Sequence, residues 1–195
     1  MRRDFFWFVF SIISGLLLQG CVTFKDGLKN PNPLSEQVIK SLNGIYQVRD
    51  KESDSVKSNV FWAYNDFFNE IDRKLIKDTA AFDTLSTKKF KLEILNKKRL
   101  QINYIKNENI VRTRIIKVRL EADGYLYLKN KNVGFILIPF LAGAIDVKQT
   151  RMTLNGEGDL LFDVANYRGG AFFFFIFLSW QNSSYRKTYA RVYQE

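Results

Sequence analysis

The sequence predicts a mainly β protein with one early α-helix, built as an antiparallel barrel or sandwich of about eight to ten strands. Three observations indicate this class. From about residue 87 onward, apolar and polar residues alternate in short runs, which is the period of strands with one solvent-facing side. Turns rich in Asn, Asp and Gly separate these runs. The one clear helical period lies early, near residues 60–77.

The N-terminus has the pattern of a secretory signal peptide. Two arginines precede an apolar run over residues 5–18, which only serines and a glycine interrupt. The run is shorter than the roughly 20 apolar residues that span a bilayer as a helix. Gly20 and the only cysteine of the chain, Cys21, follow it. We therefore expect residues 1–20 to be a signal peptide that is removed.

The segment Leu18-Gln19-Gly20-Cys21 resembles the lipobox of bacterial lipoproteins, with Gln19 where a small or hydroxylated residue usually stands. The resemblance implies cleavage before Cys21, a diacylglycerol on its thiol and acylation of its new amino group. Two or three acyl chains anchor a protein stably, since each buried CH₂ contributes ~0.8 kcal/mol. Val22 replaces the aspartate that retains many Gram-negative lipoproteins at the inner membrane. We expect the acylated Cys21 to hold the protein on the bilayer of the outer membrane, facing the periplasm.

Composition narrows the possible chemistry. The chain has no histidine, and acylation of Cys21 would leave no thiol, which removes the commonest general base, disulfides and thiolate metal sites. After removal of the signal peptide, 28 basic residues (30 minus Arg2 and Arg3) and 19 acidic residues (20 minus Asp4) remain, a formal charge of +9. This balance predicts either a solvated lysine-rich face or attraction to acidic lipid headgroups. We expect no nucleic-acid partner, no cofactor and no metal.

Two regions precede the main series of strands. Residues 21–40, punctuated by Asn30-Pro31-Asn32-Pro33, are predicted to form a tether, and 41–195 to form a single β-rich domain. A first strand is expected over 42–48. Helical spacing then predicts a helix from about residue 60 or 65 to 77, with an aromatic and aliphatic stripe packed on the core. The stripe consists of Phe61, Tyr64, Phe68, Ile71 and Leu75.

The alternating segments define the later strands. They are expected over 87–94, 100–104, 110–121, 125–128, 135–138, 151–154, 160–164, 171–178 and 188–193. Turns are expected at 96–98, 107–109, 123–124, 130–132 and 155–158, with Asp123-Gly124 as the strongest hairpin signal. The alternation slips around Ile115-Ile116, which predicts a bulge there.

Two stretches are almost free of charge. Residues 171–178 include four consecutive phenylalanines and are predicted to form one strand buried on both faces. In a barrel, Phe172, Phe174 and Ile176 would then point inward and fill the core without a sizeable pocket. The other residues of the run would need the helix around 61–75 as a lid. Residues 133–145 are predicted to form either a buried strand with its connection, or a loop that enters the membrane or contacts a partner.

One short motif matches part of a calcium-binding loop but lacks its other ligands. Asn155, Glu157 and Asp159 alternate like the first ligands of a calcium loop, but Leu160 and Asn166 stand where that loop needs glycine and glutamate, so a hairpin turn is expected.

Two further patterns could belong to an enzyme. Ser184 to Lys187 matches the Ser-x-x-Lys pair of penicillin-binding enzymes without their partner motifs. No spacing brings two of the remaining candidate carboxylates together as an acid and base pair; these are Glu70, Asp72, Asp159 and Asp163. We therefore expect a non-catalytic protein.

Three Asp-(Ser/Thr)-apolar triplets resemble the acceptors of O-glycosylation in exported proteins of Bacteroides- and Flavobacterium-like bacteria. They are centred on Ser55, Thr79 and Thr84. The resemblance implies glycans on these residues. The β-rich C-terminal half is also similar to uncharacterised lipoproteins of those bacteria, a resemblance that brings no known activity.

Gly44-Ile45-Tyr46 resembles the Gly-x-Trp start of lipocalins, with tyrosine in place of tryptophan, and Arg191 resembles the arginine that packs on that ring. The resemblance implies a barrel around a cavity for an apolar ligand. The sequence therefore predicts a membrane-anchored envelope lipoprotein that is a binding or assembly module, with another envelope protein as its further partner. The alternative is a lipocalin-like carrier of a small apolar ligand.

Overall fold

A computed structural model describes residues 24, 27–51, 67–71, 89–138, 142–172 and 176–193. The predicted lipidation site Cys21 and the predicted glycosylation sites Ser55, Thr79 and Thr84 lie outside these residues.

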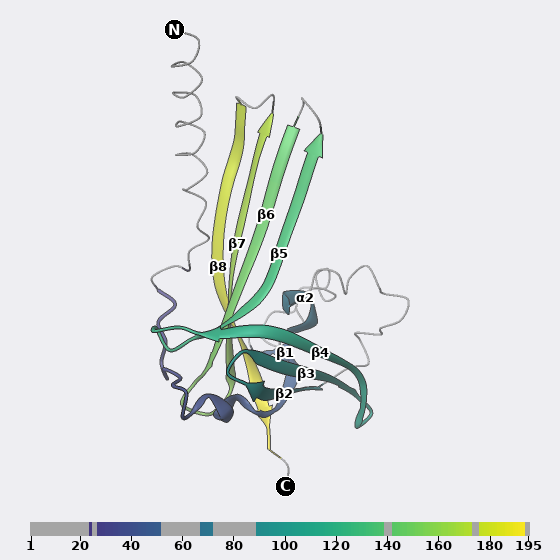
Figure 1. Ribbon diagram of the computed structural model, residues 1–195, viewed down its shortest axis with the longest axis vertical. Helices are drawn as coiled ribbons and strands as arrows, with labels where there is room; N and C mark the ends of the chain where they lie inside the picture. Colours follow the sequence, from purple (N-terminus) through teal and green to yellow (C-terminus); the bar gives the residue numbers. More distant parts are fainter. Residues whose placement is uncertain are drawn as a thin grey trace.

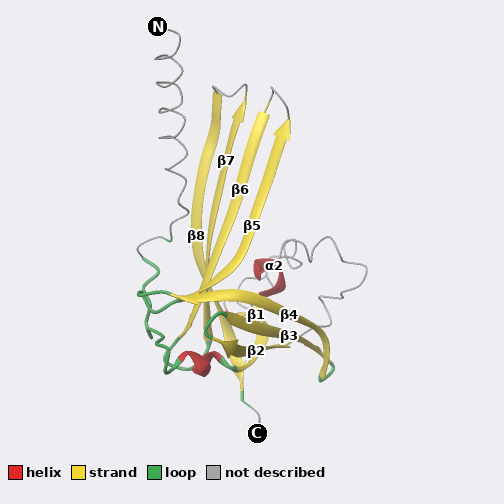
Figure 2. Ribbon diagram, viewed as in Figure 1, coloured by secondary structure: helices red, strands yellow, loops and turns green. Residues whose placement is uncertain are grey.

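Eight strands form a closed antiparallel barrel in chain order, with β8 pairing back onto β1 (Figures 1 and 2). This arrangement confirms the mainly β class and decides between the two predicted architectures in favour of the barrel. The elements are η1 (Ile39–Leu42), β1 (Gly44–Asp50), α2 (Phe67–Ile71), β2 (Lys89–Asn96), β3 (Arg99–Lys106), β4 (Asn109–Leu120), β5 (Leu126–Ile138), β6 (Ala142–Leu154), β7 (Leu160–Phe172) and β8 (Ile176–Val192).

Alternation and turn chemistry produce the hairpins as expected. In β2, buried Phe90, Leu92 and Ile94 alternate with half-buried polar residues. Gly124 joins β4 to β5 at a φ of 73°, and Gly158 joins β6 to β7 at 86°. Glycine adopts this left-handed region without the Cβ clash that other residues meet. The predicted turns at 123–124 and 155–158 are confirmed.

The predicted bulge at Ile115-Ile116 is wrong. These two residues pair regularly with Gln101 and Leu100, one isoleucine buried and the other exposed. The register shifts instead between Tyr104 and Ile105 on β3, which lie opposite Arg112 and Ile110 on β4.

Two other predictions are wrong: the turn at 130–132 and the single strand at 171–178. Residues 130–132 lie inside β5, where a register shift between Leu128 and Asn132 absorbs the extra residues, and not in a turn. Residues 171–178 are two strands, because β7 ends at Phe172, β8 begins at Ile176 and these two residues pair. An uninterrupted apolar run carries no period of two, so its sequence did not reveal the reversal. Phe172 and Ile176 are therefore not successive inward positions of one strand, and Phe174 lies outside the described residues.

The structure describes five residues of the predicted helix, α2 (Phe67–Ile71), and its Phe67 packs inside the barrel. Of the predicted stripe, Ile71 is buried in α2, whereas Phe61, Tyr64 and Leu75 lie outside the described residues. Phe67, which the predicted stripe did not include, lies four residues before Ile71 and is fully buried. The buried side chains thus sit one helical turn apart, on one face of α2.

Aromatic rings fill the interior of the barrel. Phe67 stacks on Phe90 of β2, with ring centroids 3.6 Å apart and planes at 5°. It meets Phe162 of β7 edge-on at 5.4 Å and Tyr189 of β8 at 5.1 Å. Tyr46 of β1 stacks on Phe90 from another side, at 5.6 Å. Phe67 of α2 therefore packs among the inward aromatic side chains of three strands, β2, β7 and β8.

Four of the strands continue beyond the barrel. β4 pairs with β5 only over Val118–Leu120, and the pairing of β8 with β1 ends at Tyr189. Beyond these points β5 to β8 run on together as a four-stranded sheet that leaves the other strands (Figure 1). We call this sheet the extension; it comprises residues 132–138, 142–148, 166–172 and 176–183.

Candidate functional site

The segment that leads into the barrel is bound along its outside. We call residues 24 and 27–34 the N-terminal segment. Leu34 donates its N–H to the carbonyl of Gly124 at 2.8 Å, and Thr153 Oγ1 donates to the carbonyl of Asn32 at 2.7 Å. Asn30 Nδ2 donates to the carbonyl of Asp123 at 3.0 Å. The predicted tether over 21–40 is therefore attached to the barrel over much of its length.

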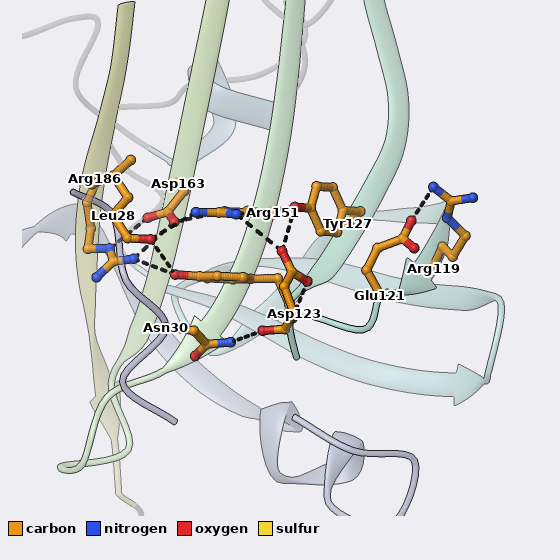
Figure 3. A network of polar contacts seen from close by, with 10 residues as sticks. Leu28, Asn30, Arg119, Glu121, Asp123, Tyr127, Arg151, Asp163 and Arg186 are labelled. Carbon is orange, nitrogen blue, oxygen red and sulfur yellow. Dashed lines mark hydrogen bonds and ion pairs between the residues drawn. The ribbon is translucent and has the colours of Figure 1, made fainter. Parts of the chain in front are cut away.

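Arg151 of β6 is the centre of this attachment (Figure 3). Its guanidinium carbon lies between two rings, 4.1 Å from the centroid of Phe24 and 3.7 Å from that of Tyr125. Nη2 donates to the carbonyl of Leu28 at 3.0 Å, and Nη1 donates to Tyr127 Oη at 3.2 Å. Arginine suits such a site because its planar, permanently charged group can stack and donate several hydrogen bonds at once.

Asp163 of β7 forms ion pairs with two arginines at the same place. Its buried carboxylate accepts hydrogen bonds from Arg151 Nε at 3.1 Å and from Arg186 Nε at 2.7 Å. Arg186 also donates to Tyr125 Oη at 2.8 Å. The hydrogen bond to Asp163 raises the pKa of Arg186 further above its ordinary value. Together Phe24, Leu28, Tyr125, Tyr127, Arg151, Asp163 and Arg186 form what we call the arginine clamp.

A second structural corner lies where the barrel closes. The Arg191 guanidinium lies over the Tyr46 ring, 5.6 Å from its centroid, and donates to the carbonyl of Asn43. Gly44 leaves room for it, because a Cβ there would lie 2.8 Å from Arg191 Nη2. Tyr46 donates its hydroxyl to the carbonyl of Leu42 at 2.9 Å, and burial raises its pKa to about 12. The predicted packing of the arginine on this ring is confirmed.

A buried ion cluster holds α2 to the barrel. Glu70 of α2 accepts from Lys187 Nζ of β8 at 2.9 Å and also from Lys148 Nζ of β6. Tyr185 donates to the same carboxylate at 2.9 Å. Burial by itself would raise the pKa of Glu70, but the two lysines outweigh burial and lower it. All three ionic side chains are less than one tenth exposed, so the cluster fixes α2 and is not open to a substrate.

A groove of about 510 Å³ lies on the outside, where β4 and β5 separate. Ile39, Val118 and Leu120 line its apolar part. Its other lining residues are Glu36, Lys97, Lys98, Arg99, Lys117, Arg119 and Lys129. Lys97 pairs with Glu36 at 2.5 Å, and Arg119 pairs with Glu121.

The remaining cations of the groove are uncompensated. Lys98, Arg99, Lys117 and Lys129 have no ion-pair partner within the part of the chain that the structure describes, and all four are exposed. A concave surface with several unpaired cations attracts anionic groups. We call it the cationic groove.

The motif at 155–159 is a hairpin turn. Asn155 Oδ1 accepts the backbone N–H groups of Glu157 at 3.0 Å and Asp159 at 2.8 Å. The Asp159 carboxylate accepts from Lys51 Nζ at 2.5 Å. Burial would raise the pKa of Asp159, but the Lys51 hydrogen bond and others lower it. These contacts explain why three polar side chains alternate here without forming a calcium loop.

The structure also places the residues of the two enzyme-like patterns, the Ser-x-x-Lys match and the candidate carboxylates. Ser184 and Lys187 lie three residues apart on β8, an odd spacing that sends their side chains to opposite faces of the sheet. Glu70, Asp159 and Asp163 are each bound to lysine or arginine, in three different clusters. Asp72 lies outside the described residues.

Sequence reasoning missed the cationic groove and the arginine clamp. Both depend on residues far apart in the chain: Lys129 lies near Arg99 only through the order of the strands, and Arg151 meets Phe24 only through the path of the N-terminal segment. The one available signal was the clustering of basic residues at 97–99 and 117–119.

The fold and these contacts define an up-and-down, eight-stranded antiparallel barrel, an architecture compatible with that of lipocalins. Comparisons with models of protein families, with curated proteins and with solved structures find no match. No helix within the described ranges is long and apolar enough to cross a membrane.

Proposed function

We propose that this chain is an exported lipoprotein that acts as a non-catalytic binding module at the membrane surface and binds anionic groups in its cationic groove. The contrast between inside and outside carries the proposal. Inside, Phe67 occupies the space among the inward rings of Phe90, Phe162 and Tyr189. Outside, a groove of about 510 Å³ presents four exposed cations that have no ion-pair partner among the described residues.

The anchor is proposed from the lipobox and fits the attached N-terminal segment. Cys21 precedes Phe24 by three residues, and Phe24 is held against Arg151 and Tyr127. Three residues span at most about 11 Å. Acyl chains on Cys21 would therefore hold the barrel close to the bilayer, because no long flexible tether separates them.

A lipocalin-like carrier is the second candidate, favoured by the packing of Arg191 on Tyr46 beside Gly44. A carrier needs an apolar space inside the barrel. Phe67 would have to leave the interior to create it, and the buried contacts of Glu70 with Lys148 and Lys187 hold the same helix in place. The filled interior therefore favours binding on the outer surface.

Mass spectrometry of the protein purified from membranes tests this proposal. We expect a mature chain that begins at Cys21 and carries two or three acyl groups, and an unprocessed precursor for Cys21→Ser. In native spectra of the same preparation, we expect an anionic ligand that is lost in the double variant Arg99→Ala, Lys117→Ala. A mature chain that begins elsewhere, or an unmodified Cys21, would refute the anchor. A co-purified neutral apolar ligand that survives the double variant would support the carrier.

A further inference from the structure

The extension brings two uncharged runs of the sequence side by side. Residues 135–145 and 169–180 contain no Asp, Glu, Lys or Arg. The strand register places them in common rows, of which Ile136–Ala144–Gly170–Leu178 and Leu137–Gly143–Ala171–Phe177 are two. The last charged row contains Asp146 opposite Arg168. Beyond that row, none of the four strands carries a charged residue.

Because these two runs contain no charged residue, neither face of the sheet that they form carries a charged side chain. Successive residues of a strand lie on opposite faces, so a sheet with one face in water alternates between apolar and polar residues. The barrel part of β2 shows such alternation, from Lys89 to Ile94. The end of the extension does not, and is therefore unsuited to water on both sides.

The dimensions fit one leaflet of a bilayer. From Phe135 to Ile138, β5 advances by three residues, or about 10 Å. The hydrocarbon of one leaflet is about 15 Å thick. The extension is thus long enough to enter one leaflet and too short to cross two.

The residues at the charged row match a membrane interface. Tyr167 lies one residue before Arg168, and Trp180 lies one residue before Gln181, which pairs with Arg168. Tyrosine and tryptophan are enriched where apolar and polar regions of a membrane meet. Trp180 lies on the uncharged side of the charged row and Tyr167 on its barrel side, so the two aromatic residues flank the row as they would at a membrane interface.

The proposed anchor lies within reach of the same surface, an argument that depends on the proposed function. The N-terminal segment is held at Arg151, which lies five residues after Asp146 on β6 and about 17 Å along the strand from it, on the barrel side. Residues 21–24 bridge up to about 11 Å of that distance, and the remaining ~6 Å (17 minus 11) falls to the lipid-bearing side chain of Cys21. A lipid on Cys21 and the end of the extension can therefore occupy one leaflet.

We propose that the end of the extension inserts into the acyl region of the leaflet that holds the lipid anchor. The protein then has two attachments to the bilayer, one covalent and one formed by its own strands. Two attachments fix the orientation of the barrel, so the cationic groove faces a constant direction relative to the membrane.

Fluorescence quenching tests the insertion. Removal of residues 1–20 leaves two tryptophans, Trp62 and Trp180. The processed protein with Trp62→Phe is reconstituted into phosphatidylcholine and phosphatidylglycerol vesicles that carry bromine on their acyl chains. We expect bromine near the headgroup end to reduce Trp180 fluorescence more than bromine near the bilayer centre. Unquenched Trp180 would overturn the proposal, as would a second copy of the chain crosslinked over this surface and excluding lipid.

A matched pair of charged variants gives the control. Leu178→Lys adds a charge to an uncharged row, so we expect the loss of Trp180 quenching while the protein stays on the vesicles through its lipid. Ile115→Lys adds the same charge at an exposed position of β4 and should leave quenching unchanged. Equal quenching in Leu178→Lys would contradict the insertion.

The mass of Cys21 and the quenching of Trp180 are independent measurements. An acylated Cys21 with unquenched Trp180 would refute the insertion and leave the anchor. An unmodified Cys21 with Trp180 quenched in added vesicles would refute the anchor and support the insertion.

Discussion

Arg151 is the side chain that joins the N-terminal segment, which has the composition of a linker, to the barrel. Its guanidinium is stacked between Phe24 and Tyr125 and bound to Asp163, with under one tenth of its side chain exposed. The asparagine- and proline-rich stretch at 30–33 has the composition of a linker, yet its backbone carbonyls and side chains find partners on the barrel. The composition of this segment therefore predicts that it is polar, but does not predict that it binds to the barrel.

Gly124 gives a direct test of that attachment. A Cβ at this position would lie 2.5 Å from Pro33 Cβ and 2.7 Å from Pro33 Cα, at a φ of 73°. We expect Gly124→Ala to displace the N-terminal segment and to lower the free energy of unfolding by about 1–3 kcal/mol. Trypsin cleavage after Lys29 and urea denaturation measure the two effects.

Gly156→Ala is the matched control for this substitution. A Cβ at Gly156 would meet nothing within 4 Å, in an exposed hairpin turn. We expect wild-type protection of Lys29 and wild-type stability. If Gly124→Ala also kept wild-type protection, the N-terminal segment would not depend on the contact between Pro33 and Gly124.

At the scale of elements, α2 is held by apolar contacts and by ions together. Phe67 and Ile71 bury its apolar side, and Glu70 binds two lysines at the edge of the filled interior. Removal of one partner from a buried ionic cluster leaves the others charged and without compensation. The position of this short helix should therefore depend strongly on one carboxylate.

Glu70 makes the stability of the protein dependent on pH. Its pKa in the folded protein is lower than the ordinary value, about 4.3. Its contribution is therefore complete above that value and is lost as the pH falls through the lower pKa of the folded state. We expect Glu70→Gln to destabilise the protein by about 3–5 kcal/mol at pH 7, a difference that narrows in acid. Urea denaturation between pH 7 and pH 2 measures it.

An exposed ion pair supplies the control for Glu70→Gln. Glu108 binds Lys89 at 3.0 Å, but its side chain is 81% exposed. Exposed pairs of this kind contribute about 0–1 kcal/mol, so Glu108→Gln should have a small effect at every pH. Equal effects of the two substitutions at pH 7 would contradict the role given to the buried cluster.

The elements also show what the sequence could and could not predict. Alternation located β2 and β3, and turn chemistry located Gly124 and Gly158, because both signals are local. The reversal between β7 and β8 was missed because consecutive apolar residues have no period of two. Asn130-Lys131-Asn132 has the composition of a turn and therefore predicts one, whereas the structure has a register shift within β5. The cationic groove needs strand order, which no local pattern contains.

At the scale of the whole molecule, the barrel and its extension have different chemistry. The barrel is filled with side chains and carries an outer groove whose exposed cations have no ion-pair partner in the described parts of the chain. The extension ends in rows without charge. This division fits the proposed binding of anionic groups from a fixed position on a membrane better than the proposed alternative of a carrier that encloses a ligand.

Neutron reflectometry of the processed protein on a supported bilayer tests this account most directly. An unattached chain from residue 21 to residue 40 would place the barrel at a typical distance of about 25 Å from the bilayer. We predict instead a barrel separated from the headgroups by less than about 11 Å, the reach of residues 21–24, and protein density within one leaflet. A solvent layer of about 25 Å, with no protein in the hydrocarbon, would contradict both the attachment of the N-terminal segment and the insertion of the extension.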